Sequence, residues 1–92
     1  MPQTHMKFQQ GLMLYEVDSG AFRAKGVSLE AWCRESGVIP NTARNALLGS
    51  SSGPSAKLLI QRMADEAGRE VVELAYRKRV DMHAEYLKAR AA

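Results

Sequence analysis

Hydrophobic residues are spaced periodically from residue 18 onward, whereas before residue 18 they form a short run without a clear period. From residue 18 onward, apolar residues recur every three or four positions, which is typical of amphipathic helices. The stretch 12–17, Leu-Met-Leu-Tyr-Glu-Val, is a short apolar run that fits either a strand or the start of a helix. We therefore expect an all-α fold, with a short N-terminal strand at 12–17 as an open alternative and a loose arm before it.

Glycines and small polar residues divide the first part of the periodic region into helices. Asp18 or Ser19 is expected to cap a short helix that ends at Gly26. Ser28 is expected to cap a second helix, and Gly37 is expected to stop it and turn the backbone.

Two prolines open the helices that follow. Pro40 and Pro54 each suit the first turn of a helix, where the missing N–H group is not needed. Gly49 and Gly68 are expected to end those helices. Residues 70–91 contain no Gly or Pro, and they predict a longer C-terminal helix of about 30 Å at 1.5 Å per residue. The expected architecture is a compact helix-turn-helix bundle of about four short helices plus this longer helix.

The segment 28–49 has the organisation of a helix-turn-helix, with two short helices across a tight turn that contains glycine. In such a motif the second helix can enter the major groove of DNA. We therefore divide the chain into an N-terminal arm or strand at 1–17, a DNA-binding domain at 18–68 and a C-terminal helix for dimerisation at 69–92. The side chains expected to face inward are small or apolar: Leu29, Trp32, Cys33, Ala43, Ala46 and Leu47.

With Pro40 as its first residue, the second helix of this motif presents polar side chains that suit a DNA groove. Arginine can form two hydrogen bonds to guanine, and asparagine can form two to adenine. We expect base contacts from Asn41, Arg44 and Asn45. We expect contacts to the DNA backbone from Thr42, Ser50 and Lys57. As alternatives, Asn41 could cap the helix and Arg44 could be a solvated surface charge.

The distribution of charge favours a nucleic-acid partner more than the net charge of +3 does. Between Glu35 and Asp65 the sequence has no carboxylate, while Arg44, Lys57 and Arg62 lie in this window. Carboxylates would repel phosphates, so their absence fits a surface that faces double-stranded DNA. A chance distribution is the alternative. We expect Lys57 rather than Arg62 to meet phosphate, because it is nearer to the second helix of the motif.

Several function classes have no support in the sequence. Cys33 is the only cysteine, so an internal disulfide is impossible, and no His or Cys cluster suggests a metal site. No apolar run is long enough for a membrane span, and no signal peptide is recognisable. We find no phosphate-binding glycine loop and no paired catalytic groups. We therefore expect a cytoplasmic protein that is not an enzyme, has no cofactor and has no evident small-molecule substrate.

The C-terminal helix has a stripe of apolar or amphipathic residues, at Val72, Tyr76, Val80, His83 and Leu87. A domain of this size is too small to cover the whole stripe, so part of it should meet another chain. We expect a homodimer that reads a two-fold operator. A protein-interaction module, such as an antiactivator or antitoxin-like protein that acts through this helix, is the alternative.

The sequence of residues 22–49, FRAKGVSLEAWCRESGVIPNTARNALLG, resembles a family of small phage-associated DNA-binding regulators of Mu-like prophages. More distantly, it resembles the helix-turn-helix of lambda-repressor-like DNA-binding domains. The resemblance implies a repressor-like transcription regulator. It departs from the family at Ala43, where valine is usual. The matching positions are Gly26, Val27, Ser28, Trp32, Glu35, Gly37 and Leu47 to Gly49.

Overall fold

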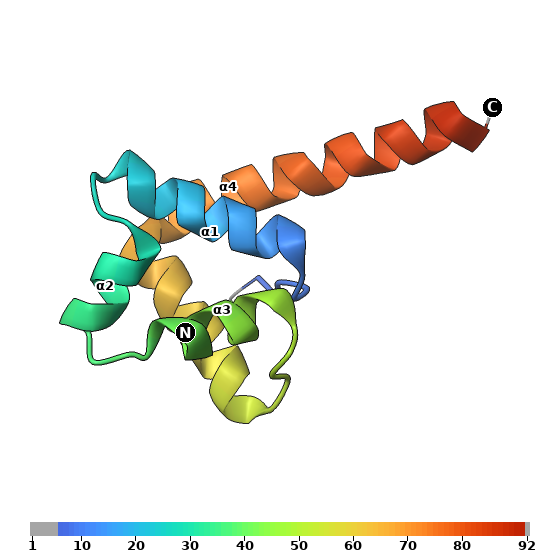
Figure 1. The fold of residues 1–92 in the computed structure, drawn as a ribbon. Coiled ribbons are helices and arrows are strands. Elements are labelled where there is room, and N and C mark those ends of the chain that lie inside the picture. The colour runs from blue at the N-terminus through green and yellow to red at the C-terminus, as the bar shows by residue number, and fades with distance from the viewer. Residues whose placement is uncertain (1–5, 92) are drawn as a thin grey trace, which may run out of the picture.

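The computed structural model describes residues 6–91, and this part of the chain consists of helices and the segments that join them (Figure 1). The all-α prediction is therefore confirmed. Residues 1–5 of the predicted arm, and residue 92 of the predicted C-terminal helix, lie outside the described residues. The helices are α1 (Leu12–Ala24), α2 (Leu29–Glu35), α3 (Pro40–Leu48) and α4 (Pro54–Ala91).

The first helix begins earlier than the capping signals predict. Residues 12–17 form the first half of α1, so the alternative of an N-terminal strand is wrong. Asp18 and Ser19 lie in the middle of α1, so the prediction that one of them caps a helix is wrong too. The N-cap residue is Gly11, whose carbonyl accepts a hydrogen bond from the N–H of Tyr15 at 3.1 Å. Residues 12–17 continue the helix that follows them, because the two segments together bury one side of α1. The buried residues on this side are Leu14, Val17, Asp18, Ala21 and Phe22.

The helix-turn-helix segment has the boundaries that its capping residues predict. The hydroxyl group of Ser28 accepts a hydrogen bond from the N–H of Ala31 at 3.1 Å and so caps α2. Pro40 is the first residue of α3. Gly49 ends that helix with a left-handed backbone (φ 99°), and its N–H donates to the carbonyl of Asn45 at 3.0 Å.

The last helix bends at Gly68, where the sequence predicts a stop. Gly68 has φ 106° and ψ 92°, a conformation that an α-helix does not contain. Figure 1 shows α4 changing direction behind α1, so that its second part runs back across the bundle. Carbonyl groups next to such a break lack regular helical partners. The amino group of Lys25 donates to one of them, the carbonyl of Glu66, at 2.8 Å.

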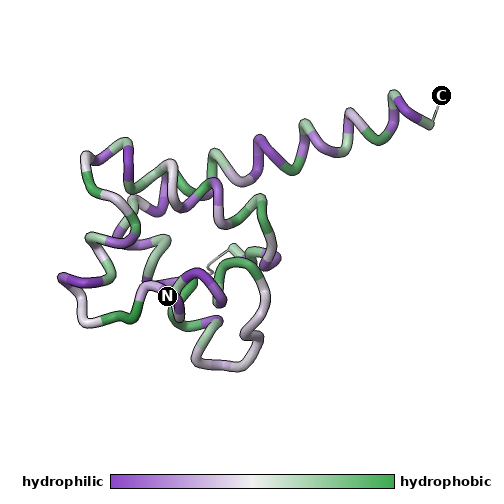
Figure 2. Tube along the Cα trace, in the orientation of Figure 1, coloured by the Kyte–Doolittle hydropathy of each residue, from purple (hydrophilic) through white to green (hydrophobic). Residues whose placement is uncertain are grey.

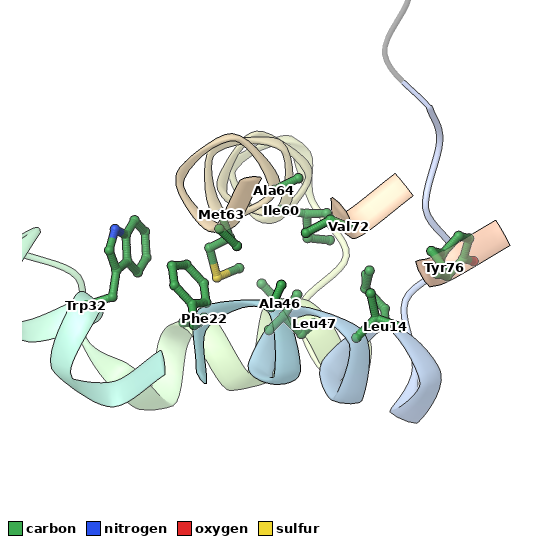
Figure 3. Packing of buried hydrophobic residues seen from close by; sticks show 14 of the residues in the cluster. Leu14, Phe22, Trp32, Ala46, Leu47, Ile60, Met63, Ala64, Val72 and Tyr76 are labelled. Atoms are coloured by element: carbon green, nitrogen blue, oxygen red, sulfur yellow. The ribbon is translucent and has the colours of Figure 1, made fainter. Parts of the chain in front are cut away.

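The core lies where α1, α3 and α4 meet, and α2 closes one end of it (Figure 3). The rings of Phe22 and Trp32 pack with their centroids 5.2 Å apart. Cys33 is fully buried, so the prediction that it is a small core residue is confirmed. The fully enclosed apolar side chains include Leu14, Ala43, Leu47, Met63, Ala64 and Val72.

The described part of the N-terminal arm, residues 6–11, is packed against the bundle, so the expectation of a loose arm is wrong there. The ring of Phe8 meets the ring of Tyr76 edge-on, with centroids 5.0 Å apart. The N–H of Gln9 donates to the hydroxyl group of Tyr76 at 2.9 Å, and the N–H of Gly11 donates to the carbonyl of Leu47 at 2.7 Å. The arm therefore ties the end of α3 to the second part of α4.

Beyond Tyr76, α4 leaves the bundle and projects away from it (Figure 1). Residues 77–91, which we call the rod, are exposed at every position. The expectation that the small domain leaves part of the C-terminal stripe uncovered is therefore confirmed. None of the helices in residues 6–91 combines the length and the apolar character needed to cross a membrane.

Candidate nucleic-acid interface

Helix α3 has one buried side and one free side. Ala43, Ala46 and Leu47 are buried, whereas Asn41, Thr42 and Arg44 are exposed. Within the described residues no side chain caps α3. Its N-cap residue is Ile39, and Asn41 lies inside the first turn, so the alternative in which Asn41 caps the helix is not realised. The first turn of α3 also has no acidic residue. Its free side is thus polar, accessible and without a carboxylate of its own.

The guanidinium group of Arg44 is held in place by α1. It donates a hydrogen bond to the hydroxyl group of Tyr15 at 3.3 Å, and its central carbon lies 5.6 Å from the centroid of the Tyr15 ring. This hydrogen bond to the hydroxyl group of Tyr15 raises the pKa of Arg44 further, so the side chain stays charged. A positioned guanidinium loses less conformational freedom on binding than a freely solvated one.

An open hollow lies beside this arginine, where α1 faces the N-terminal ends of α2 and α3. Arg23, in the last turn of α1, lines the hollow and adds a second cation to the surface that includes Arg44 and Asn41. Arg23 and Tyr15 have no local sequence signal for this site, because only the packing of α1 against α3 brings them to it. Glu30 of α2 also lines the hollow. The sequence between Glu35 and Asp65 has no carboxylate, but the folded surface around Arg44 does include one, from Glu30.

The remaining predicted contact residues differ in accessibility. Asn45 is half-buried near the end of α3, and its carbonyl accepts hydrogen bonds from the N–H groups of Gly49 and Ser51. Ser50 is exposed after α3, and Lys57 is exposed in the first turn of α4. The structure thus leaves five of the six predicted residues on the surface and Asn45 partly covered.

Arg62 is engaged with the bundle. Its guanidinium carbon lies 5.3 Å from the centroid of the Trp32 ring, and it donates to the carbonyl of Ser36 at 3.4 Å. Lys57 has an exposed side chain in the first turn of α4, next to the connection from α3. Both side chains are exposed, and Arg62 is engaged with the bundle in the same way as Arg44 is.

Residues with metal-binding or nucleophilic chemistry do not gather at this site. In residues 6–91, no group of three or more His, Cys, Asp or Glu side chains could hold a metal ion. Burial raises the pKa of the Cys33 thiol, with a smaller contribution from Glu30. The thiol therefore stays protonated in the interior.

Comparison with known proteins finds no family model that matches the chain, and no similar curated protein or solved structure. The function of the α3 surface is therefore inferred from its geometry and its chemistry.

Proposed function

We propose that this chain is a sequence-specific transcriptional regulator that binds double-stranded DNA and places α3 in the major groove. The observation that supports the proposal most directly is the free side of α3, where Asn41, Thr42 and Arg44 are exposed together. The proposal is also supported by the order of α2, a short turn with Gly37, and α3, since a helix-turn-helix has two short helices across such a turn.

The side chains of the surface suit different parts of the duplex. In this proposal Arg44 reads a guanine and Asn41 reads an adenine, because each can form two hydrogen bonds to that base. We assign Asn45 a similar but more restricted role, since it is half-buried. The expected contacts to phosphate groups come from Thr42, Ser50 and Lys57. None of these roles requires a catalytic step, a metal or a cofactor.

We further propose that the protein acts as a homodimer on a two-fold operator. Equivalent reading helices would then meet half-sites about 34–36 Å apart, or a multiple of that distance. The resemblance of residues 22–49 to regulators of Mu-like prophages supports a repressor-like, phage-associated role.

The proposal is tested by selecting bound duplexes from a random pool with the full chain. We expect a palindromic consensus. Arg44→Ala should then weaken binding to that consensus by roughly 1–3 kcal/mol and relax the preference at one base position in each half-site. Lys57→Ala should weaken binding to all duplexes about equally and reduce the salt dependence.

Arg90→Ala is the matched control, because it removes the same charge at the far end of the rod. We expect it to leave the base preference unchanged. If no sequence is enriched, or if Arg44→Ala has the same consensus as the unchanged chain, α3 is not the reading helix.

A protein-interaction module is the second candidate function. It is favoured by the uncovered rod, which exposes Val80, Met82, Tyr86 and Leu87. An amphipathic helix of this kind can lie in the groove of a partner protein. Binding to a protein that is insensitive to salt, with no shift of duplex DNA at low salt, would favour this candidate over the first.

A further inference from the structure

The rod is a helix without tertiary packing of its own. All of its side chains are exposed, and an isolated helix of this length is only marginally stable in water. Its base contacts the bundle through the exposed ion pair between Arg79 and Glu16, with 2.9 Å between the nitrogen and oxygen atoms. Beyond that point, within the described residues, no bundle side chain buries it.

One side of α4 carries a continuous stripe that points away from the bundle. We call it the outer face. Successive members are three or four residues apart, so they follow one side of the helix for five turns, or about 27 Å. Three of its apolar side chains, Val71, Leu74 and Met82, are 56%, 66% and 62% exposed. The outer face consists of Val71, Leu74, Lys78, Met82, Glu85 and Ala89.

The outer face is longer than the other uncovered stripe with apolar residues on the rod. Figure 2 shows hydrophobic positions recurring between hydrophilic ones along the whole rod. Val80 and Leu87 continue the side on which Tyr76 is buried, but they span only about two turns, or roughly 10 Å. A helix docked on the outer face would make a contact more than twice as long.

The two charged members of the outer face decide how a second copy fits. Lys78 and Glu85 lie seven residues apart, at equivalent positions of successive heptads. In a parallel pair in register, Lys78 would meet Lys78 and Glu85 would meet Glu85, and each contact would be repulsive. In an antiparallel pair, each lysine faces a glutamate. From this charge complementarity we infer that two copies of the chain associate through their outer faces, with the helices antiparallel.

The pairing of Lys78 with Glu85 also sets the register of the whole interface. It places Leu74 opposite Ala89 of the second copy, and it brings the two Met82 side chains together near the two-fold axis. The charged pairs then lie on either side of an apolar centre. The arrangement is closed and symmetric, as most homodimers are. It extends the dimeric form proposed above, and its test uses no DNA, so failure of DNA binding would leave it unaffected.

Charge reversal of the full chain, followed by sedimentation equilibrium at low salt, tests the pairing. The unchanged chain should be a dimer. Lys78→Glu and Glu85→Lys should each weaken dimerisation by roughly tenfold or more, because each turns two attractive contacts into repulsive ones. The variant with both changes restores the opposite charges, and its dissociation constant should return to within about threefold of the original.

Arg77→Glu is the control, because it makes the same charge change about 100° around the helix from Lys78. It should change the dissociation constant by less than about threefold. A chain that is monomeric at all accessible concentrations would overturn the proposal, and so would a double variant that dimerises no better than the single ones. Unchanged dimerisation of both single variants would assign the contact to the side with Val80 and Leu87.

Disulfide cross-linking provides an independent measurement of helix direction. Chains with Leu74→Cys, mixed with chains with Ala89→Cys, should form a mixed disulfide on oxidation. Chains with Leu74→Cys alone should not, because the two copies of residue 74 are separated by roughly 22 Å along an antiparallel pair. Rapid self-linking of the Leu74→Cys chains would show a parallel pair and overturn the proposal. The native Cys33 is buried and does not interfere.

Discussion

Replacing Asp18 with asparagine should stabilise the protein at about pH 8 much more than at about pH 4. Asp18 lies in the middle of α1, and its side chain is completely buried. Neither of its carboxylate oxygens has a hydrogen-bond partner among the described residues. Because a buried charge without such partners is unfavourable, burial raises the pKa of Asp18 from 3.8 to about 7. The positive charge of Arg69 acts in the opposite direction and is the smaller effect.

The magnitude follows from the difference between the folded and unfolded pKa of this group. The folded chain holds the proton more tightly than the unfolded chain, so between about pH 4 and pH 7 it carries more protons. Stability must then fall as the pH rises through this window. A change from 3.8 to about 7, at 1.36 kcal/mol per unit, amounts to roughly 4 kcal/mol. Asparagine does not ionise, so the stability of the variant does not fall in this way as the pH rises.

Urea unfolding of both proteins at the two pH values, at one protein concentration, measures the effect. The burial of an amide has the same energy at both pH values, so it cancels when the two stability differences are subtracted. Asp81→Asn is the control, because Asp81 is exposed on the rod and the same substitution should change stability little at either pH. Equal effects of Asp18→Asn at both pH values would refute the assignment of a raised pKa.

Two further pairs of substitutions test the fold. Gly68→Ala should destabilise the chain by about 1–3 kcal/mol in urea unfolding, because alanine is strained at φ 106°. Gly20→Ala should stabilise the chain by up to about 1 kcal/mol, because Gly20 lies in regular helix and no atom is near the new methyl group. Two effects of the same sign would show that the kink does not depend on glycine. Phe22→Ala should cost about 3–5 kcal/mol in the same assay, whereas Leu58→Ala, at an exposed position, should change stability by less than about 0.5 kcal/mol.

The parts of the fold that the sequence predicts correctly depend on local chemistry. Ser28 caps α2 through a bond to a residue three positions away, and Pro40 opens α3 because its backbone already suits a first turn. The break at Gly68 is equally local, since a φ of 106° favours glycine. The inward side of α3 follows from helical spacing alone.

The parts that the sequence does not predict depend on contacts between distant segments. The start of α1 has no capping side chain, so only the packing of its apolar run decides between strand and helix. Phe8 meets Tyr76, and Tyr15 meets Arg44, across long stretches of chain that have no local signal. Asp18 looks like a capping residue in the sequence because Asp is common at N-caps. Its burial follows only from the fact that α1 begins at Leu12, which places Asp18 in the middle of the helix on its buried side.

Helix α1 connects the candidate DNA surface with the rod. Tyr15 holds Arg44 on one side of α1, and Glu16 pairs with Arg79 at the base of the rod on another. An exposed ion pair such as Glu16–Arg79 contributes little to stability. The relative placement of the two surfaces must therefore come from the apolar side of α1, where Leu14 and Phe22 pack against α3 and α4. If the proposed dimer binds a two-fold operator, the spacing of its reading helices is consequently set by the core of each subunit and by the pairing of the rods, and not by the Glu16–Arg79 ion pair.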